Sequence, residues 1–201
     1  MEKEKFYIFL DIDGTLYTQQ DIHEFTTAGF PIYLSANFWP QDCNAESREA
    51  FNKIIDTLEQ NYDTEVVIVS RKRKDMQMCE HYLKEVYKLH ISKPLQRTPY
   101  VMGERSDKII DYIENDCGLY PKTKNVIKNL LNKKRLTSNY VIIDDDTSAK
   151  DMGTALLSKV FGEENYIHVN GKRSSLRMSQ ANEFLKSKNL IPEDLLIAQL
   201  F

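Results

Sequence analysis

Near the amino terminus, an apolar run changes abruptly into a pair of carboxylates. Phe6–Leu10 is apolar throughout, and Asp11, Asp13 and Gly14 follow it. Such a run, ended by a turn-forming glycine, predicts a strand buried on both faces, as in a parallel sheet. Because side chains alternate along a strand, we expect Asp11 and Asp13 to point the same way. Two neighbouring carboxylates repel each other unless a cation or a proton lies between them, so this stretch indicates a metal-assisted site.

Two later apolar runs also end in polar residues. Glu65–Ser70 is rich in aliphatic residues and ends on a hydroxyl, and Tyr140–Ile143 leads directly into the acidic cluster Asp144–Asp146. Residues 45–61 have the apolar spacing of an amphipathic helix and lie between the first two runs, which favours a parallel crossover. The carboxyl ends of parallel strands meet at one edge, where ligands bind. The three strand ends are therefore expected to form one site, with the oxygen ligands that suit Mg²⁺.

The same periodicities predict the remaining elements. We expect helices over residues 75–89, 107–115, 179–188 and 195–201 and within 120–138 and 147–161, with short strands over 98–102 and 166–169. No linker or repeat divides the chain, so residues 1–201 are expected to form one domain. Three cysteines without metal-type spacing, no long apolar span and no apolar signal region predict a soluble cytoplasmic protein without a membrane partner. Nothing in the sequence sets an oligomeric state.

Two segments leave alternatives open. Tyr17–Asn44 is a long loop rich in aromatic residues, which either covers the sheet edge or forms a flap over the site. Arg71–Lys74 places four cations directly after Ser70. These cations are either a solvated charge run or, in part, contacts for a substrate that contains phosphate.

The strand ends resemble the motifs of the haloacid dehalogenase (HAD) superfamily. Asp11-Ile12-Asp13-Gly14-Thr15 resembles its first motif, Ser70 after an aliphatic strand its second, and Ile142-Ile143-Asp144-Asp145 its fourth. The resemblance implies an α/β fold of three layers, with a Rossmann-like parallel sheet, helices on both faces and a small cap or none. It also implies a Mg²⁺-dependent phosphatase that hydrolyses a phosphate monoester through an aspartyl-phosphate.

The resemblance gives each matched carboxylate a role. Asp11 would be the nucleophile and a metal ligand. Asp13 would be the general acid and base, with its backbone carbonyl on the metal. Asp144 and Asp145 would complete the metal site. Asp146 is the alternative ligand if the motif is shifted by one residue along the three consecutive Asp residues.

Phosphate binding is implied for a second group of residues. Ser70 and Arg71 would contact the phosphate from the second motif, and Gly14 and Thr15 from the first. The third motif of the superfamily is a lysine, for which Lys108 at a predicted helix start is the first choice. The rival candidates are Lys122, Lys124 and Lys128.

The substrate class depends on the size of the cap. Residues 17–44 are too few for a large cap domain, so they form at most a minimal cap and leave the site open to a bulky ester. The segments Ser70-Arg71, Lys108–Ile113 and Tyr140–Asp146 also resemble HAD domains of nucleic-acid end-repair proteins. The expected substrate is a nucleotide or a nucleic-acid end. The alternatives are a small-metabolite phosphatase or phosphotransferase, and a catalytically inactive HAD-like binding module.

Overall fold

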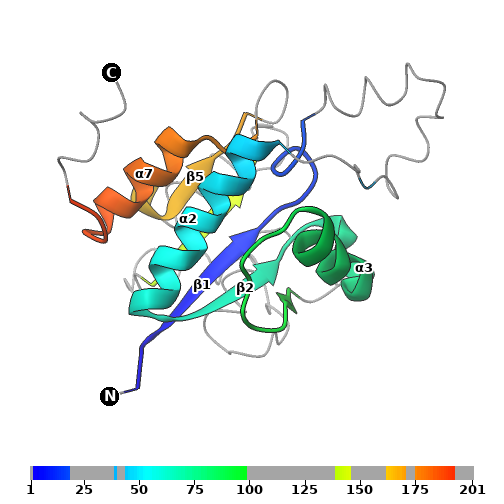
Figure 1. Cartoon of the computed structure of the whole chain (residues 1–201), viewed down its shortest axis with the longest axis horizontal. Helices are drawn as coiled ribbons and strands as arrows, with labels where there is room; N and C mark the ends of the chain where they lie inside the picture. The colour runs from blue at the N-terminus through cyan, green and yellow to red at the C-terminus, as the bar shows by residue number, and fades with distance from the viewer. Residues whose placement is uncertain are drawn as a thin grey trace, which may run out of the picture.

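A five-stranded parallel sheet forms the centre of the computed structural model, in the order β3-β2-β1-β4-β5 (Figure 1). The structure describes residues 2–18, 39, 44–98, 139–145, 162–170 and 175–192, with the backbone alone at residue 71. The strands are β1 (Lys5–Leu10), β2 (Asp63–Ile68), β3 (Gln96–Arg97), β4 (Tyr140–Asp144) and β5 (Tyr166–His168). Since all five run in the same direction, their carboxyl ends share one edge, with β1 between its neighbours β2 and β4.

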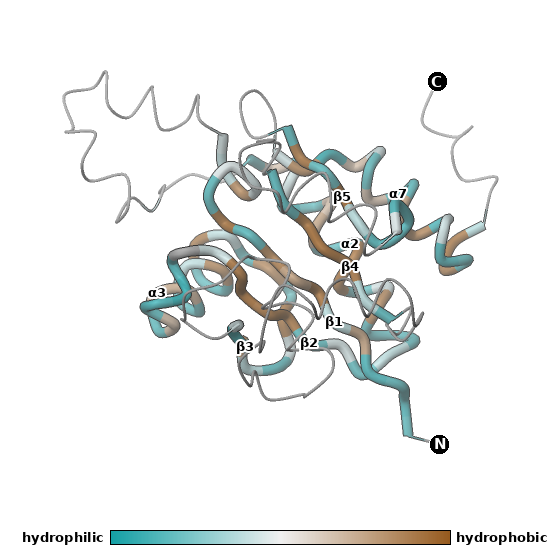
Figure 2. Tube along the Cα trace, turned by 180° about the vertical axis from the view of Figure 1, so that it is seen from behind, coloured by the Kyte–Doolittle hydropathy of each residue, from teal (hydrophilic) through white to brown (hydrophobic). Residues whose placement is uncertain are grey.

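The predicted burial of β1 on both faces is confirmed. Phe6, Ile8 and Leu10 belong to the main hydrophobic core, and Tyr7 and Phe9, on the opposite face, are buried as well. The hydrophobic stretches of the chain run along the central strands (Figure 2). Each fully buried side chain of this kind contributes about 1.5–3 kcal/mol, so β1 is held firmly in the middle of the sheet.

Helices α2 (Ala45–Asn61) and α7 (Met178–Ser187) pack against each other over one face of the sheet (Figure 1). The Asn44 side chain caps α2 by accepting a hydrogen bond from the Ser47 amide at 2.9 Å. Apolar side chains at three- and four-residue spacing then face the core, among them Phe51, Ile54 and Leu58. The predicted helix over residues 45–61 is therefore confirmed, and 179–188 is confirmed within one residue.

The predicted helix over residues 75–89 is wrong in its extent. The chain forms a 3₁₀ turn, η2 (Arg71–Lys74), then α3 (Met76–His81) and a π-helical segment, η3 (Tyr82–Val86). Asp75 separates the first two because its side chain accepts a hydrogen bond from the Met78 amide at 2.9 Å, which starts a new helix. A further 3₁₀ turn, η4 (Glu163–Asn165), precedes β5.

Two strands differ from the sequence prediction in the described residues. β2 begins at Asp63, two residues before the predicted start at Glu65, because Thr64 pairs with Phe6 and is buried. β3 lies at Gln96–Arg97, where no strand was predicted, and pairs with the end of β2. The strands over 140–143 and 166–169 are confirmed within one residue.

The α/β, Rossmann-like parallel fold expected from the sequence is confirmed. The helices predicted over residues 107–115, 120–138, 147–161 and 195–201 lie outside the described residues, as do 99–102 and most of 17–44. One domain over residues 1–201 therefore stays a prediction. Within the described ranges, no helix has both the length and the apolar character needed to cross a membrane.

Candidate active site

Backbone hydrogen bonds extend the sheet just past the strand ends and so fix the backbone of Asp11, the candidate nucleophile. The Asp11 amide donates to the Ile143 carbonyl at 3.0 Å, and the Val69 amide donates to the Leu10 carbonyl at 3.0 Å. On the other side, the Val169 amide donates to the Asp144 carbonyl at 2.9 Å. Asp11 is therefore held between β2 and β4 at the carboxyl edge.

Three carboxylates gather at this edge. Asp11, Asp144 and Asp145 each present an oxygen, and the three oxygens lie within 4.8 Å of one another. Asp11 and Asp144 are buried and Asp145 is half-buried. Buried carboxylates this close repel one another strongly, and hard oxygen donors are the ligands that Mg²⁺ prefers. The donor set therefore fits Mg²⁺, whereas the alternative ligand Asp146 lies outside the described residues.

The turn after Asp13 is shaped to admit one of these carboxylates. Gly14 has a positive φ of 81°, and a Cβ atom there would collide with the carboxylate of Asp145. A residue without a side chain is therefore required at this position. The Thr15 amide donates to the Ile12 carbonyl at 3.3 Å, and its hydroxyl is buried without a hydrogen-bond partner in the described part of the chain. The predicted phosphate contacts of Gly14 and Thr15 stay predictions.

Asp13 has surroundings that differ from those of Asp11. Its side chain is 41% exposed and contacts Tyr17, Ser70 and Lys72. The Tyr17 hydroxyl donates a hydrogen bond to Oδ1, and the Lys72 ammonium lies 3.4 Å from the same oxygen. The Ser70 hydroxyl donates to Oδ2 at 3.1 Å. The two carboxylates of the first motif thus lie in separate environments.

Ser70 lies two residues beyond the end of β2, whereas the sequence predicted it as the last residue of that strand. It is buried and caps η2, since its hydroxyl accepts a hydrogen bond from the Lys72 amide at 3.3 Å. The buried Arg73 guanidinium donates from Nη1 to the carbonyls of Val69 and Ser70, at 3.0 and 2.7 Å. These contacts fix the backbone that carries Ser70, which places its hydroxyl next to Asp13.

Lys72, which the sequence offered only as one of the four cations of residues 71–74, is a functional candidate in the structure. Its side chain is only 2% exposed, and its ammonium lies 4.3 Å from the centre of the Trp39 ring and 5.8 Å from that of Tyr17. Burial lowers the pKa of Lys72, while the charge of Asp13 acts in the opposite direction. Interpreting residues 71–74 as a solvated charge run is therefore wrong for Lys72 and for the buried Arg73. The available signal was the position of Lys72 two residues after Ser70.

Cys79 packs beneath this turn. Its thiol is buried and donates to the Lys72 carbonyl at 3.3 Å, and burial raises its pKa from 9.0 to about 12. The native thiol binds its proton more tightly than the thiol of the unfolded chain. Cys79 therefore stays protonated and unreactive between about pH 9 and pH 12 in the native protein. We expect Cys79 to resist iodoacetamide at pH 9 in the native protein and to react once urea unfolds it. Peptide mass spectrometry would measure this, and rapid native labelling would contradict the packing.

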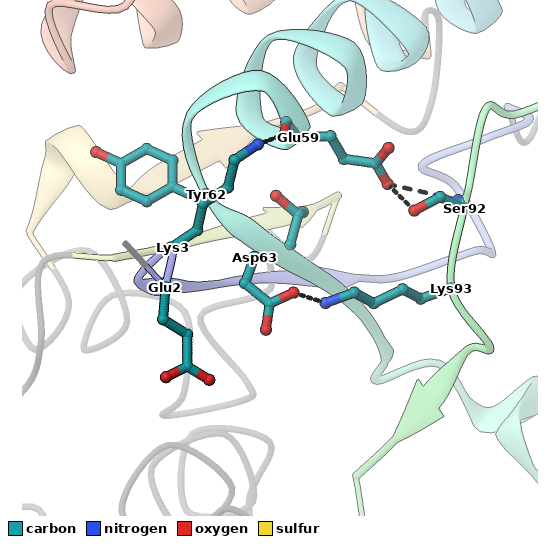
Figure 3. Close-up of a pocket in the computed structure, with 8 residues that line it drawn as sticks. Glu2, Lys3, Glu59, Tyr62, Asp63, Ser92 and Lys93 are labelled. Atoms are coloured by element: carbon teal, nitrogen blue, oxygen red, sulfur yellow. Dashed lines mark hydrogen bonds and ion pairs between the residues drawn. The ribbon is translucent and has the colours of Figure 1, made fainter.

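A pocket lies at the opposite edge of the sheet, where β1 and β2 begin (Figure 3). Its polar groups are largely paired with one another. Lys93 forms an ion pair with Asp63, and the Ser92 hydroxyl donates to Glu59 at 2.7 Å. The Lys3 ammonium donates to the Glu59 carbonyl at 2.7 Å. Since these groups satisfy one another, the carboxyl edge is the stronger candidate site in the described part of the chain.

The structure brings five of the predicted site residues together. Asp11, Asp144 and Asp145 form one group, and Asp13 and Ser70 lie beside each other. The side chain of Arg71 is not described, and Lys108 and its three rivals lie outside the described ranges. Their predicted phosphate contacts therefore stay predictions.

Comparison with known proteins agrees with this geometry. A family model described as the HAD domain in Swiss Army Knife RNA repair proteins matches residues 7–173. No curated protein and no solved structure gives a significant match. The matched residues cover most of the chain, from within β1 to beyond β5, and include both groups of site residues. The chain therefore belongs to the family of HAD domains found in Swiss Army Knife RNA repair proteins, which places it among the HAD-type hydrolases.

Proposed function

We propose that this chain is a Mg²⁺-dependent phosphatase that removes a monoester phosphate from a nucleic-acid end or a nucleotide. One observation carries the proposal, which is the separation of the two carboxylates of the first motif. Asp11 lies with Asp144 and Asp145, whereas Asp13 lies beside Ser70 and is partly exposed. These are the surroundings that a nucleophile next to a metal and a proton donor facing the leaving group require.

The reaction would proceed in two steps. An oxygen of Asp11 would attack phosphorus, forming an aspartyl-phosphate as the bond from phosphorus to the leaving oxygen breaks. Asp13 would give its proton to that oxygen. In the second step Asp13 would take a proton from the attacking water, and hydrolysis would release phosphate and restore the Asp11 carboxylate.

The remaining groups would bind the phosphoryl group. Asp11, Asp144 and Asp145 would hold Mg²⁺, which supplies neutralisation of charge on the phosphoryl oxygens. The Ser70 hydroxyl, held next to Asp13, would turn to donate a hydrogen bond to a phosphoryl oxygen. The fixed backbone around Ser70 supports this role, since precise positioning accounts for much of phosphoryl-transfer catalysis.

The family match favours a nucleic-acid substrate, because the matched domains are described as parts of RNA repair proteins. Arg71 directly follows Ser70 in the chain and would hold a neighbouring phosphate of a polymer. We expect a 3′-phosphorylated oligoribonucleotide to release phosphate only with Mg²⁺. Its kcat/KM is expected to exceed that of a 3′-mononucleotide by about tenfold, because more phosphates are bound. Phosphate release measured with Mg²⁺ and with EDTA would test this.

The substitution Arg71→Ala is expected to lower turnover of the oligonucleotide more than that of the mononucleotide, and Lys53→Ala on α2 is the control. Equal turnover of both substrates would instead favour a small-metabolite phosphatase. Transfer of phosphate to an added alcohol would indicate a phosphotransferase. Absence of any Mg²⁺-dependent release would leave the inactive binding module as the better interpretation.

A further inference from the structure

The two oxygens of the Asp13 carboxylate have different partners. Oδ1 receives the Tyr17 hydroxyl and lies 3.4 Å from the Lys72 ammonium, whereas Oδ2 receives only the Ser70 hydroxyl among the contacts described above, at 3.1 Å. Terminal rotation of a carboxylate is ordinarily broad and roughly twofold. Two partners on one oxygen therefore give this carboxylate a defined orientation.

The partners of Oδ1 are both buried away from solvent. Tyr17 is 3% exposed, and the side chain of Lys72 is 2% exposed. Trp39 covers the Lys72 ammonium from one side, and its ring also packs on Tyr82 with 4.7 Å between ring centres. An ammonium enclosed by aromatic rings is held by cation–π attraction as well as by its ion pair. A substrate would therefore approach Asp13 from the exposed side of its carboxylate.

Other contacts fix Tyr17 and Lys72 in turn. Tyr17 also forms a backbone bridge with Asp13, which holds its backbone next to the residue that its hydroxyl contacts. Lys72 belongs to η2, which Ser70 caps, and its carbonyl accepts the Cys79 thiol. A functional group is most effective when the residues that support it are themselves locked in place.

We propose that Tyr17 and Lys72 are positioning residues that anchor Oδ1 of Asp13, so that Oδ2 exchanges the proton with the leaving group. The inference rests on the proposed function. As the phosphoryl group binds, the Ser70 hydroxyl turns to a phosphoryl oxygen and frees Oδ2. In the protonated form of Asp13 that the first step requires, Oδ2 then presents a proton taken up from solvent to the leaving oxygen. The proton passes from Oδ2 to the leaving oxygen while the bond between that oxygen and phosphorus breaks, and the Asp13 carboxylate remains.

This arrangement has a consequence for different leaving groups. A sugar hydroxyl leaves poorly unless it is protonated, whereas p-nitrophenolate is stable enough to leave with little help. Loss of the anchor should therefore slow the sugar ester much more than the nitrophenyl ester. General acid catalysis typically contributes about a hundredfold to ten-thousandfold, so a partial loss through misalignment is measurable.

The experiment compares Tyr17→Phe and Lys72→Met with the unchanged chain, using Lys53→Ala on α2 as the control. Tyr17→Phe removes a single oxygen and is expected to lower kcat for a 3′-phosphorylated oligoribonucleotide by about tenfold, and kcat for p-nitrophenyl phosphate by about twofold at most. Lys72→Met is expected to lower kcat with the same preference for the sugar ester. Lys72→Arg, which keeps the positive charge, is expected to recover part of the lost kcat. KM should change little, and Lys53→Ala should behave like the unchanged chain.

Equal losses of kcat on both esters would overturn the inference, because general structural damage does not depend on the leaving group. An unchanged kcat in Tyr17→Phe would overturn it as well. If Lys72→Met does not fold, the comparison depends on Tyr17→Phe, whose ring and packing are retained. If the unchanged chain hydrolyses neither ester with Mg²⁺, the proposed function itself fails, whereas activity without leaving-group selectivity in the variants rejects only the positioning role.

Discussion

The substitution Asp11→Asn is expected to lower Mg²⁺-dependent phosphate release by about a thousandfold or more, since removal of a nucleophile abolishes the covalent route. An amide has nearly the shape of the carboxylate, so the backbone bonds that hold this residue between β2 and β4 should remain. The substitution also removes one negative charge from the group that Asp11 forms with Asp144 and Asp145. Repulsion within that group should fall, and the midpoint of thermal unfolding without Mg²⁺ is expected to rise.

The same variant should respond less to the metal. A ligand that binds only the native state stabilises it more the more tightly it binds, so Mg²⁺ should raise the unfolding midpoint less in Asp11→Asn than in the unchanged chain. Asp56→Asn provides a matched control, because Asp56 is exposed on α2 and pairs with His90 instead of the site. Phosphate release within a few-fold of the unchanged chain would exclude Asp11 as the nucleophile. A Mg²⁺ shift of unchanged size would exclude it as a metal ligand.

The parts of the fold that the sequence predicted well depend on local patterns. β1 and β4 are uninterrupted apolar runs, and α2 has a clear apolar face and an asparagine cap, so each can be located from its own residues. The acidic residues that follow β1 and β4 could be brought to one site because parallel strands place their carboxyl ends together. The group of Asp11, Asp144 and Asp145 follows from this rule alone.

The prediction for the region after β2 failed because the structure there depends on partners that are distant in the sequence. Lys72 and Arg73 belong to a run of four cations, which from the sequence is typical of an exposed surface. Lys72 is buried because Asp13 and Trp39 neutralise and cover it, and Arg73 is buried because it holds the carbonyls at the end of β2. No local pattern marks these contacts, so burial of a charged run could not be predicted.

The difference in surroundings between Asp11 and Asp13 needed the structure for the same reason. The sequence places them one residue apart, and the family resemblance gave them different roles. What separates their surroundings is the Ser70 hydroxyl, 57 residues from Asp13, together with the Tyr17 hydroxyl on the returning turn. Tyr17 is the first residue of the segment 17–44, whose role the sequence leaves open, and its own contact with Asp13 places this residue at the site.

The substitution Gly14→Ala is expected to disable the site and to destabilise the chain by about 1–3 kcal/mol, the usual cost of an ordinary residue in a strained backbone conformation. The positive φ of 81° already disfavours a side chain. The added Cβ would also meet the Asp145 carboxylate, which must then move away from Asp11 and Asp144. Displacing one of three oxygen donors should weaken Mg²⁺ binding, so both phosphate release and the Mg²⁺-induced rise in unfolding midpoint should fall.

Gly162→Ala separates these two effects. Gly162 has a φ of 84°, and a Cβ there would meet the side chain of Glu164, which is exposed and free to turn outward. The backbone strain is therefore similar, whereas no site carboxylate is displaced. We expect Gly162→Ala to lower the unfolding midpoint but to keep the full Mg²⁺ shift and the phosphatase rate. If Gly14→Ala also keeps its Mg²⁺ shift, the close approach of Asp145 to this turn is not needed for metal binding, and the strain at Gly14 is only that of the turn.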